Sequence, residues 1–329
     1  MKLWLDRPDI KESLDDFLHD VANVFQLGTI KKFSRFPFGY QELNIKLETS
    51  QGIYAVKTFS REKPLSRVKE NIQGYLEFPK LGIPMPKLLV TNNNETILIT
   101  EGKHQKVYTC VMEYFEGKSF LQLPVTKRDV IQITKCMAYI HQSKLKPAHY
   151  YDTLGIVNFE YIYEKQVDTL SAQDNNEIKQ TLKEFQRINL TKFHQSVIHG
   201  TLERENILKN SQGAYCILDL GCMDYNASIV DIATFLANFT IDMDGEETVE
   251  MIKESLTEYQ KFHMLTADER LALPILIEAQ YAILVMGMTH AMKMEHDDSK
   301  QTNRWLEFGK HGLKKFQGIH SLPLQKPMG

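Results

Sequence analysis

The stretches HGTLEREN, residues 199–206, and ILDLG, residues 217–221, decide the fold and the chemistry of this chain. Between them, a Ser-Gln-Gly turn at residues 211–213 separates two short runs of strand-forming residues, which predicts a tight β-hairpin. Asn206 stands before the hairpin and Asp219 after it. Mg²⁺ prefers oxygen ligands and takes only one or two of them from protein. A lone Asn or Asp could equally be a turn or cap residue, but with the whole frame of residues 199–221 present we expect this amide and this carboxylate to hold Mg²⁺.

The bulk composition places the chain among ordinary globular proteins. It has 329 residues, of which 43% are hydrophobic and 25% charged, enough for two lobes or two domains. The formal net charge of −3 shows no excess of basic residues, so the composition indicates neither a nucleic-acid-binding surface nor a polybasic patch for membrane binding. The longest apolar stretch, residues 272–288, is interrupted by Pro274, Glu278 and Gln280, so it predicts a buried helix and no membrane span.

The cysteines and the N-terminal residues favour a cytoplasmic protein. The four cysteines form no CxxC pair and have no zinc-ligand spacing, so we expect four reduced thiols. The first residues, MKLWLD, turn acidic at once and lack the apolar core of a signal peptide.

The first part of the chain predicts a small lobe built on an antiparallel sheet. Apolar residues at helical spacing from Leu14 to Phe25 predict an amphipathic helix. Strands are then expected at residues 29–36, 42–48, 53–59, 87–91, 96–100 and 107–114, with one main helix at residues 64–78. We expect this small lobe to span residues 1–114.

After Glu116-Gly117 the pattern becomes mainly helical. Helices are expected to end near His141 and to span residues 175–188, 229–239, 246–262, 267–292 and 301–316. The hairpin described above interrupts them. The fold class is therefore α+β: a small sheet lobe, then a larger helical lobe over residues 115–329 with an inserted β-hairpin.

Phosphoryl transfer needs charge neutralisation on a triphosphate and an aligned nucleophile, and the small lobe offers candidates for the nucleotide. Lys57 ends the strand IYAVK and looks like the lysine that reaches the α- and β-phosphates of ATP in kinases. Its expected partner on the following helix is Glu70, with Glu77 as the alternative.

Two further segments of the small lobe carry weaker signals. Residues 36–44 occupy the position of a phosphate-covering loop, but with Gly39 as their single glycine they could equally be an ordinary β-turn. Met112, Glu113 and Phe115 close the last strand, where backbone groups of a hinge could hydrogen-bond adenine. Chemically, that segment could be any strand end.

Together these motifs resemble the aminoglycoside phosphotransferase and choline kinase-like family. The resemblance runs over residues 33–239 and includes YAVK (54–57), GIPMP (82–86), MEYFEG (112–117), AYIH (138–141), the two opening stretches and DIA (231–233). It implies a protein-kinase-like two-lobe fold, ATP and Mg²⁺ as cofactors, and phosphorylation of a small-molecule hydroxyl. His199 is then expected to pack beneath the loop, and Asp231 to anchor the loop or cap its helix.

The chain departs from this family at Thr201, which stands where the proton-accepting Asp belongs. A Thr hydroxyl cannot act as a carboxylate base at pH 7, and a general base typically contributes ~10²–10⁴-fold to a rate. Glu203 and Glu205 are nearby carboxylates that could substitute, although we expect both to be solvated surface residues. Two hypotheses follow: a small-molecule phosphotransferase impaired at its base, or a catalytically inactive nucleotide-binding pseudokinase or scaffold.

The sequence says little about the molecule that would accept the phosphoryl group. Asp242, Asp244, Glu246 and Glu247 form an acidic stretch that could attract an amine-containing substrate. Acidic residues also suit the positive end of a helix dipole, and we favour this second interpretation.

Overall fold

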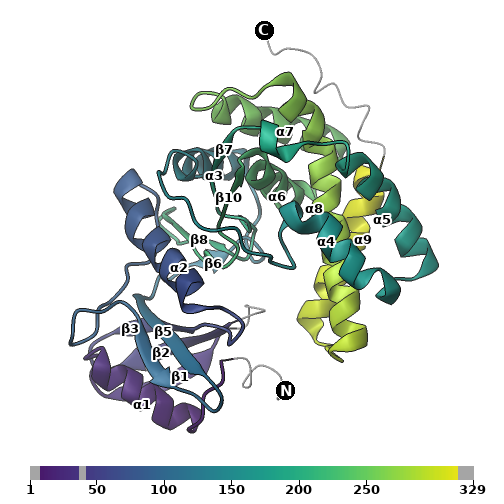
Figure 1. Ribbon diagram of the computed structural model, residues 1–329. Coiled ribbons are helices and arrows are strands. Elements are labelled where there is room, and N and C mark those ends of the chain that lie inside the picture. The colour runs from purple at the N-terminus through teal and green to yellow at the C-terminus, as the bar shows by residue number, and fades with distance from the viewer. Residues whose placement is uncertain (1–7, 37–41, 318–329) are drawn as a thin grey trace. The chain divides into compact units, whose positions relative to one another are not determined.

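The computed structural model describes residues 8–36 and 42–317, and the chain divides into two compact units (Figure 1). The first unit comprises residues 1–80, 84–118 and 208–218, and the second comprises residues 81–83, 119–207 and 219–329. The boundary between the two units thus falls at Lys118, whereas the sequence predicted a boundary at residue 114. It also groups the hairpin of residues 208–218 with the first unit.

The first unit is built on a five-stranded antiparallel sheet with the order β1-β2-β3-β5-β4. The strands are β1 (Ile30–Arg35), β2 (Leu43–Thr49), β3 (Ile53–Thr58), β4 (Leu98–Glu101) and β5 (Lys106–Glu113). In β2, buried and half-buried side chains alternate along the whole strand, because one face of the pleat covers the core. The expected antiparallel sheet is confirmed.

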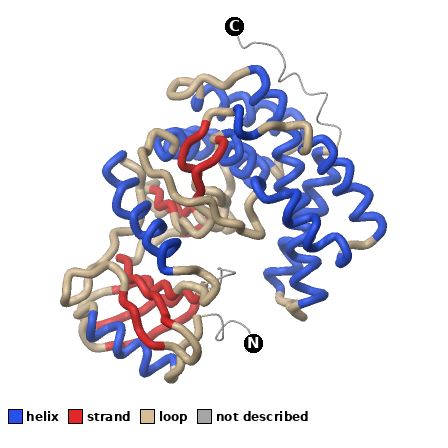
Figure 2. The backbone as a smooth tube through the Cα atoms, in the orientation of Figure 1, coloured by secondary structure: helices blue, strands red, loops and turns tan. Residues whose placement is uncertain are grey.

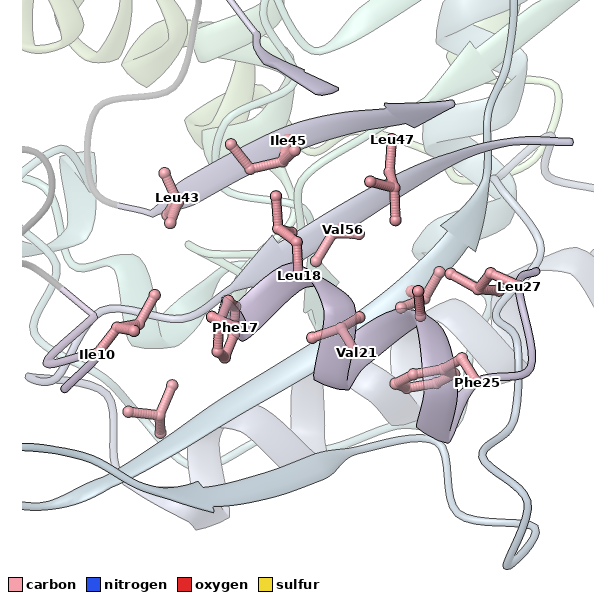
Figure 3. Close-up of a cluster of buried hydrophobic side chains, with 13 residues drawn as sticks. Ile10, Phe17, Leu18, Val21, Phe25, Leu27, Leu43, Ile45, Leu47 and Val56 are labelled. Atoms are coloured by element: carbon pink, nitrogen blue, oxygen red, sulfur yellow. The ribbon is translucent and has the colours of Figure 1, made fainter. Parts of the chain in front are cut away.

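Helix α1 (Leu14–Val24) covers one face of this sheet (Figure 3). It starts at Ser13, whose hydroxyl accepts the backbone N–H of Asp16 at 3.2 Å and so caps a helix end. Phe17, Leu18 and Val21 lie on one side of the helix by the 3.6-residue period, and they pack against the inward residues of β2 and β3. Burial of these apolar side chains holds helix and sheet together.

The strand expected at residues 87–91 does not form. Only Leu88 makes an isolated bridge, to Met112 of β5. The backbone nevertheless follows β5, since Leu89 donates to the Val111 carbonyl and Glu113 to the Lys87 carbonyl, each at 2.9 Å. Strand β4 pairs with residues 106–109 of β5. Residues 87–89 and β4 therefore share one edge of β5, instead of pairing with each other as a hairpin.

The second unit is mainly helical (Figure 2). Its α-helices are α3 (Lys127–Ile140), α4 (Phe159–Gln166), α5 (Ala172–Phe185), α6 (Ile229–Thr240), α7 (Gly245–Tyr259), α8 (Ala267–Met294) and α9 (Lys300–Phe316). All except α4 were expected. The apolar signal of α4 is short, since only Phe159, Ile162 and Gln166 are buried in its eight residues.

Helix α8 is the central element of this unit and packs against α4, α5, α6 and α9. It is long and apolar enough to cross a membrane, but 83% of its most apolar window is buried inside the protein. A helix that is apolar all round and covered by neighbours is a core helix. The expectation of a buried helix is confirmed.

Short strands position the loops between the helices. Strands β7 (Gln195–Ile198) and β10 (Asp224–Ala227) pair antiparallel, whereas β6 (Lys118–Ser119), β8 (Ile207–Lys209) and β9 (Tyr215–Ile217) form a small sheet. The hairpin β8–β9 turns where expected, with Asn210 N donating to the Ala214 carbonyl at 2.9 Å. The β7–β10 pair was not anticipated, because each strand has only four residues.

Candidate active site

The loop of residues 199–206 begins where β7 ends, and its first turn depends on Gly200. This residue has φ +86°, a left-handed conformation that side chains disfavour. A Cβ atom at this position would lie 2.2 Å from the backbone oxygen of Cys222. Only glycine therefore allows the loop to pass this close to the segment that follows Asp219.

Asp231, in the first turn of α6, anchors the start of the loop. Its carboxylate accepts the backbone N–H of His199 at 2.6 Å and that of Gly200 at 2.7 Å. His141 Nε2 donates to the same carboxylate at 3.1 Å, and the Tyr259 hydroxyl lies 2.8 Å from His141 Nδ1. Burial raises the pKa of Asp231, but the hydrogen bond and charge of His141, the charge of His199 and the Gly200 N–H together outweigh burial, so the pKa lies below its usual value. The expected anchoring role is confirmed.

Thr201 follows at the position where a base was expected. The residue is buried, and its backbone N–H donates to Nδ1 of His199 at 3.4 Å. His199 is itself fully buried beneath the loop, as expected. The backbone carbonyl of Thr201 accepts from Glu203 N at 2.8 Å and from the Asn206 side-chain amide at 3.0 Å. Thr201 thus closes a compact turn that fixes Asn206.

The donor atoms of Asn206 and Asp219 suit a Mg²⁺ ion. Because the Asn206 NH₂ group donates to Thr201, its oxygen is the end of the amide that can ligate. Asp219 has φ +60°, and its Oδ1 accepts the Gly221 N–H at 2.9 Å. Within residues 8–36 and 42–317, no group of three or more His, Cys, Asp and Glu side chains could hold a metal alone. An ion here would take its other ligands from phosphate oxygens and water, as Mg²⁺ commonly does.

Glu203 is not the solvated surface residue that the sequence suggested. It is only 6% exposed, and its carboxyl accepts Nε2 of Gln280, on α8, at 3.2 Å. Burial is the main cause, and the charge of Glu205 a smaller one, that together raise the pKa of Glu203 to about 8. At neutral pH this environment favours the protonated form of Glu203, which packs against α8.

Glu205 also differs from the expectation, since its side chain is 14% exposed. Arg304 of α9 reaches it, with Nη2 3.6 Å from Oε2. Burial raises the pKa of Glu205 to about 7; the Arg304 charge opposes this shift and the Asp219 charge adds to it. The sequence contains no periodic signal that would bring α9 to this loop.

In the first unit, Lys57 lies on β3 and is 3% exposed. It forms a buried ion pair with Glu42, which also pairs with Lys63 at 2.7 Å. Glu42 directly precedes β2, and sequence reasoning did not single it out. Glu70 pairs with Arg67 at 3.2 Å, and Glu77 pairs with Lys80 at 2.7 Å. The proposed Lys57–Glu70 pair stays a prediction.

The expected adenine-binding segment closes β5. Met112 is buried and Glu113 is exposed. The Glu113 N–H donates to the Lys87 carbonyl at 2.9 Å and the Tyr114 N–H to the Ile53 carbonyl at 3.3 Å, so both donors are already used within the unit. An adenine contact would therefore fall to other backbone groups of the segment, such as those at Phe115. Gly39 lies outside the described residues.

The acidic stretch caps a helix and lines a pocket. Asp244 is the N-cap of α7 and forms a capping box with Glu247, which confirms the helix-terminus interpretation. Asp242 forms an ion pair with Arg204 of the loop. An open pocket of about 760 Å³ is lined here by Ile241, Asp242, Met243, Asp244, Gly245, Thr248, His311 and Lys315.

Comparison with known proteins agrees with these features. The model of the phosphotransferase enzyme family matches residues 32–265, more than half of the chain. Among solved structures, an amicoumacin kinase, hAmiN, in complex with AMP-PNP, Ca²⁺ and Ami has a TM-score of 0.68 at 13% identity, over 94% of this chain and 97% of that chain. A microcompartment-associated aminopropanol kinase has a TM-score of 0.67 at 12% identity, over 94% and 100%. A choline kinase, LicA, from Streptococcus pneumoniae has a TM-score of 0.62 at 16% identity, over 92% and 99%.

The antiparallel sheet unit and the helical unit thus define a kinase-like fold. The chain belongs to the phosphotransferase enzyme family. Phosphoryl transfer is the class of activity that this membership gives it.

Proposed function

We propose that this protein transfers the γ-phosphoryl group of ATP to the hydroxyl of a small molecule, with Mg²⁺ held by Asn206 and Asp219. The observation that carries the proposal is the fixed loop. Asp231 holds its start, and the amide of Asn206 is turned so that its oxygen can ligate. The bound ion would neutralise charge on the phosphates.

Lys57 is the proposed phosphate-binding residue, with Gly39, Glu70, Met112, Glu113 and Phe115 as further proposed nucleotide contacts. The buried pair with Glu42 fixes the Lys57 ammonium on the central strand of the sheet. An immobilised cation loses little side-chain freedom when it meets a phosphate, which favours binding.

The acceptor is proposed to carry an amine as well as a hydroxyl. Several structural neighbours are named for such substrates, among them aminopropanol and choline. An adenine nucleotide as phosphoryl donor is supported by two structural neighbours. One is hAmiN in complex with AMP-PNP, and the other is a spectinomycin phosphotransferase in complex with ADP. We place the reaction in the cytoplasm, in agreement with the thiols, all four of which are free.

The alternative function is nucleotide binding without transfer, and Thr201 is the observation that favours it. A buried Thr offers no carboxylate for proton abstraction. Phosphoryl transfer rests mainly on positioning and electrostatics, so a missing base slows it without removing it. For this reason we place transfer first.

Calorimetry tests what the two functions share, and turnover separates them. Titration calorimetry with Mg·ATP should show binding under both. Turnover should then be measured on ethanolamine, choline, 1-amino-2-propanol and spectinomycin, for wild type and Thr201→Asp. Acceptor-dependent ADP formation by the wild type supports transfer. Binding without turnover, together with a gain of activity in Thr201→Asp, supports the silent alternative, and absence of Mg·ATP binding contradicts both.

A further inference from the structure

We propose that His149, oriented by Asp224, accepts the proton of the acceptor hydroxyl, the role for which Thr201 is unsuited. The inference rests on the proposed phosphotransferase function and adds a catalytic residue to it. His149 lies in the segment between α3 and α4, eight residues after His141 and outside every motif discussed above.

The His149–Asp224 contact has the geometry of an oriented base. Nδ1 of His149 lies 2.7 Å from Oδ2 of Asp224. A carboxylate only accepts hydrogen bonds, so Nδ1 carries the proton and Nε2 of the neutral ring keeps its lone pair. The Asp224 side chain is 4% exposed, whereas that of His149 is 40% exposed. The buried carboxylate therefore holds a ring that is partly open to solvent.

Backbone contacts hold Asp224 in place. Its Oδ1 accepts the backbone N–H of Tyr225 at 2.8 Å, and a side-chain contact adds to this, since Asn226 Nδ2 lies 3.5 Å from Oδ2. Asp224 begins β10 and pairs in register with Ile198, the last residue of β7. A carboxylate at a strand pair is better fixed than one on a loop, which favours a positioning role.

The pairing of β7 with β10 places the His149–Asp224 pair, called the dyad below, near the candidate active site. Ile198 leads directly into His199, Gly200 and Thr201, and Asp224 follows Asp219 by five residues. The close approach of Gly200 to Cys222 keeps the two chain segments together beyond the paired strands. Chain geometry then limits Thr201 to about 10 Å from Ile198, at ~3.3 Å per residue. The dyad therefore lies at the base of the loops that bear Thr201 and Asp219.

The carboxylates inside the loop are engaged elsewhere. Glu203 is buried and bonded to Gln280, and Glu205 lies beside Arg304. Each packs the loop against a helix of the second unit. His149 has a more exposed side chain than either of them.

Two exposed tyrosines extend the dyad into a surface on which a small molecule could rest. The Tyr151 ring meets that of His149 edge to face at 4.6 Å, and the Tyr161 ring lies 5.0 Å from Tyr151. Tyr151 is 62% and Tyr161 45% exposed, and the Lys165 ammonium lies 5.6 Å from the centroid of the Tyr161 ring. Aromatic rings with a polar edge suit a ligand that has both carbon and hydroxyl groups.

In the proposed step, the acceptor oxygen forms a bond to the γ-phosphorus of ATP while its proton passes to Nε2 of His149. The bond between the γ-phosphorus and the β,γ-bridging oxygen breaks, and ADP leaves with that electron pair. The imidazolium, stabilised by the Asp224 carboxylate, later returns the proton to solvent. No further reactant is required.

The test uses His149→Ala in the full-length protein, with kcat, KM for ATP and KM for the best acceptor of the panel above. We expect kcat to fall about 10²–10³-fold, as for loss of a general base, with KM for ATP unchanged. Added imidazole should restore part of kcat. His19→Ala is the matched control, because His19 also lies beside an aspartate, Asp15, at 3.5 Å, but in the first unit.

A second variant separates catalysis from folding. Thr201→Asp placed in the His149→Ala background should recover turnover, since it supplies a carboxylate base to the same reaction. Unchanged kcat in His149→Ala, or a loss that neither imidazole nor Thr201→Asp restores, overturns the inference while leaving the proposed function standing. Failure of the wild-type protein to turn over any acceptor counts against the proposed function itself.

Discussion

The carboxylate of Asp231 accepts the backbone N–H of Gly200 at 2.7 Å, and this bond ties helix α6 to the first turn of the candidate catalytic loop. The same carboxylate holds His199 N and His141. One buried charge therefore fixes the loop, its supporting histidine and a residue at the end of α3.

Asp231→Ala should both destabilise the protein and reduce activity. The change leaves two buried N–H groups and His141 without their acceptor, at a cost of about 1–3 kcal/mol for each unsatisfied group. Urea unfolding followed by circular dichroism checks the expected loss of several kcal/mol. Asp168→Ala, at an exposed position, should change stability by less than ~0.5 kcal/mol. Equal effects of the two substitutions would contradict the anchoring role.

Gly200→Ala tests the close approach to Cys222, with Gly213→Ala as the matched control. Both glycines have a positive φ, +86° and +83°, but nothing lies within 4 Å of a Cβ at Gly213. The control should lose only the ~1–2 kcal/mol of the left-handed conformation. Gly200→Ala should lose clearly more, because its Cβ meets a backbone oxygen. The denaturant midpoints of the two variants are compared. Equal losses of stability would show that the approach to Cys222 does not require glycine at position 200.

Lys57 and Lys63 both pair with Glu42, which makes them a matched pair for nucleotide binding. Lys57→Met should weaken Mg·ATP binding about tenfold or more, the equivalent of one charge-assisted contact. Lys63→Met removes a charge from the same carboxylate and should leave affinity nearly unchanged. Calorimetry measures both, and a larger effect at Lys63 would refute the assignment of Lys57 to the phosphates.

Glu278 should make stability decrease as the pH rises. Burial on α8, and to a smaller extent the charge of Glu184, raise the pKa of this carboxyl to about 8. Between its ordinary value, 4.5, and about 8, the folded state keeps a proton that the unfolded state has released, so the free energy of unfolding falls with pH. Below this window both states are protonated, and above it the loss is complete.

Glu278→Gln removes this titration. The variant should gain stability relative to wild type as the pH rises from 5 to 8, by an amount on the order of 3 kcal/mol. Chemical denaturation at several pH values provides the comparison. A difference between the two proteins that stays constant with pH would show that Glu278 does not carry the shift.

The motifs allowed much of the fold to be predicted, because local spacing encodes local structure. The amphipathic period predicted α1, and the alternation along β2 predicted a half-buried strand. Residues 87–91 have strand composition but lie on an edge that β4 partly occupies, and strand composition alone does not reveal this arrangement. Helix α4 was missed because eight residues hold too few periods.

The candidate site was predictable in its loop motifs and not in its long-range contacts. Asn206, Asp219 and Asp231 follow from spacing within one short region. The burial of Glu203 depends on Gln280, and that of Glu205 on Arg304, and both partners come from helices far along the chain. His149 and Asp224 are likewise joined by a side-chain contact between segments that lie 75 residues apart in the sequence. Sequence spacing cannot predict such contacts, since they depend on how the helices pack.

Phosphorus-31 NMR of the reaction with Mg·ATP and each acceptor of the panel is the most direct test of the central claim. The account predicts that, with at least one hydroxyl-bearing acceptor, the γ-phosphate resonance is replaced by that of a phosphate ester, and that Asp219→Asn slows this conversion. Release of inorganic phosphate alone, or an unchanged ATP spectrum with every acceptor, would contradict it.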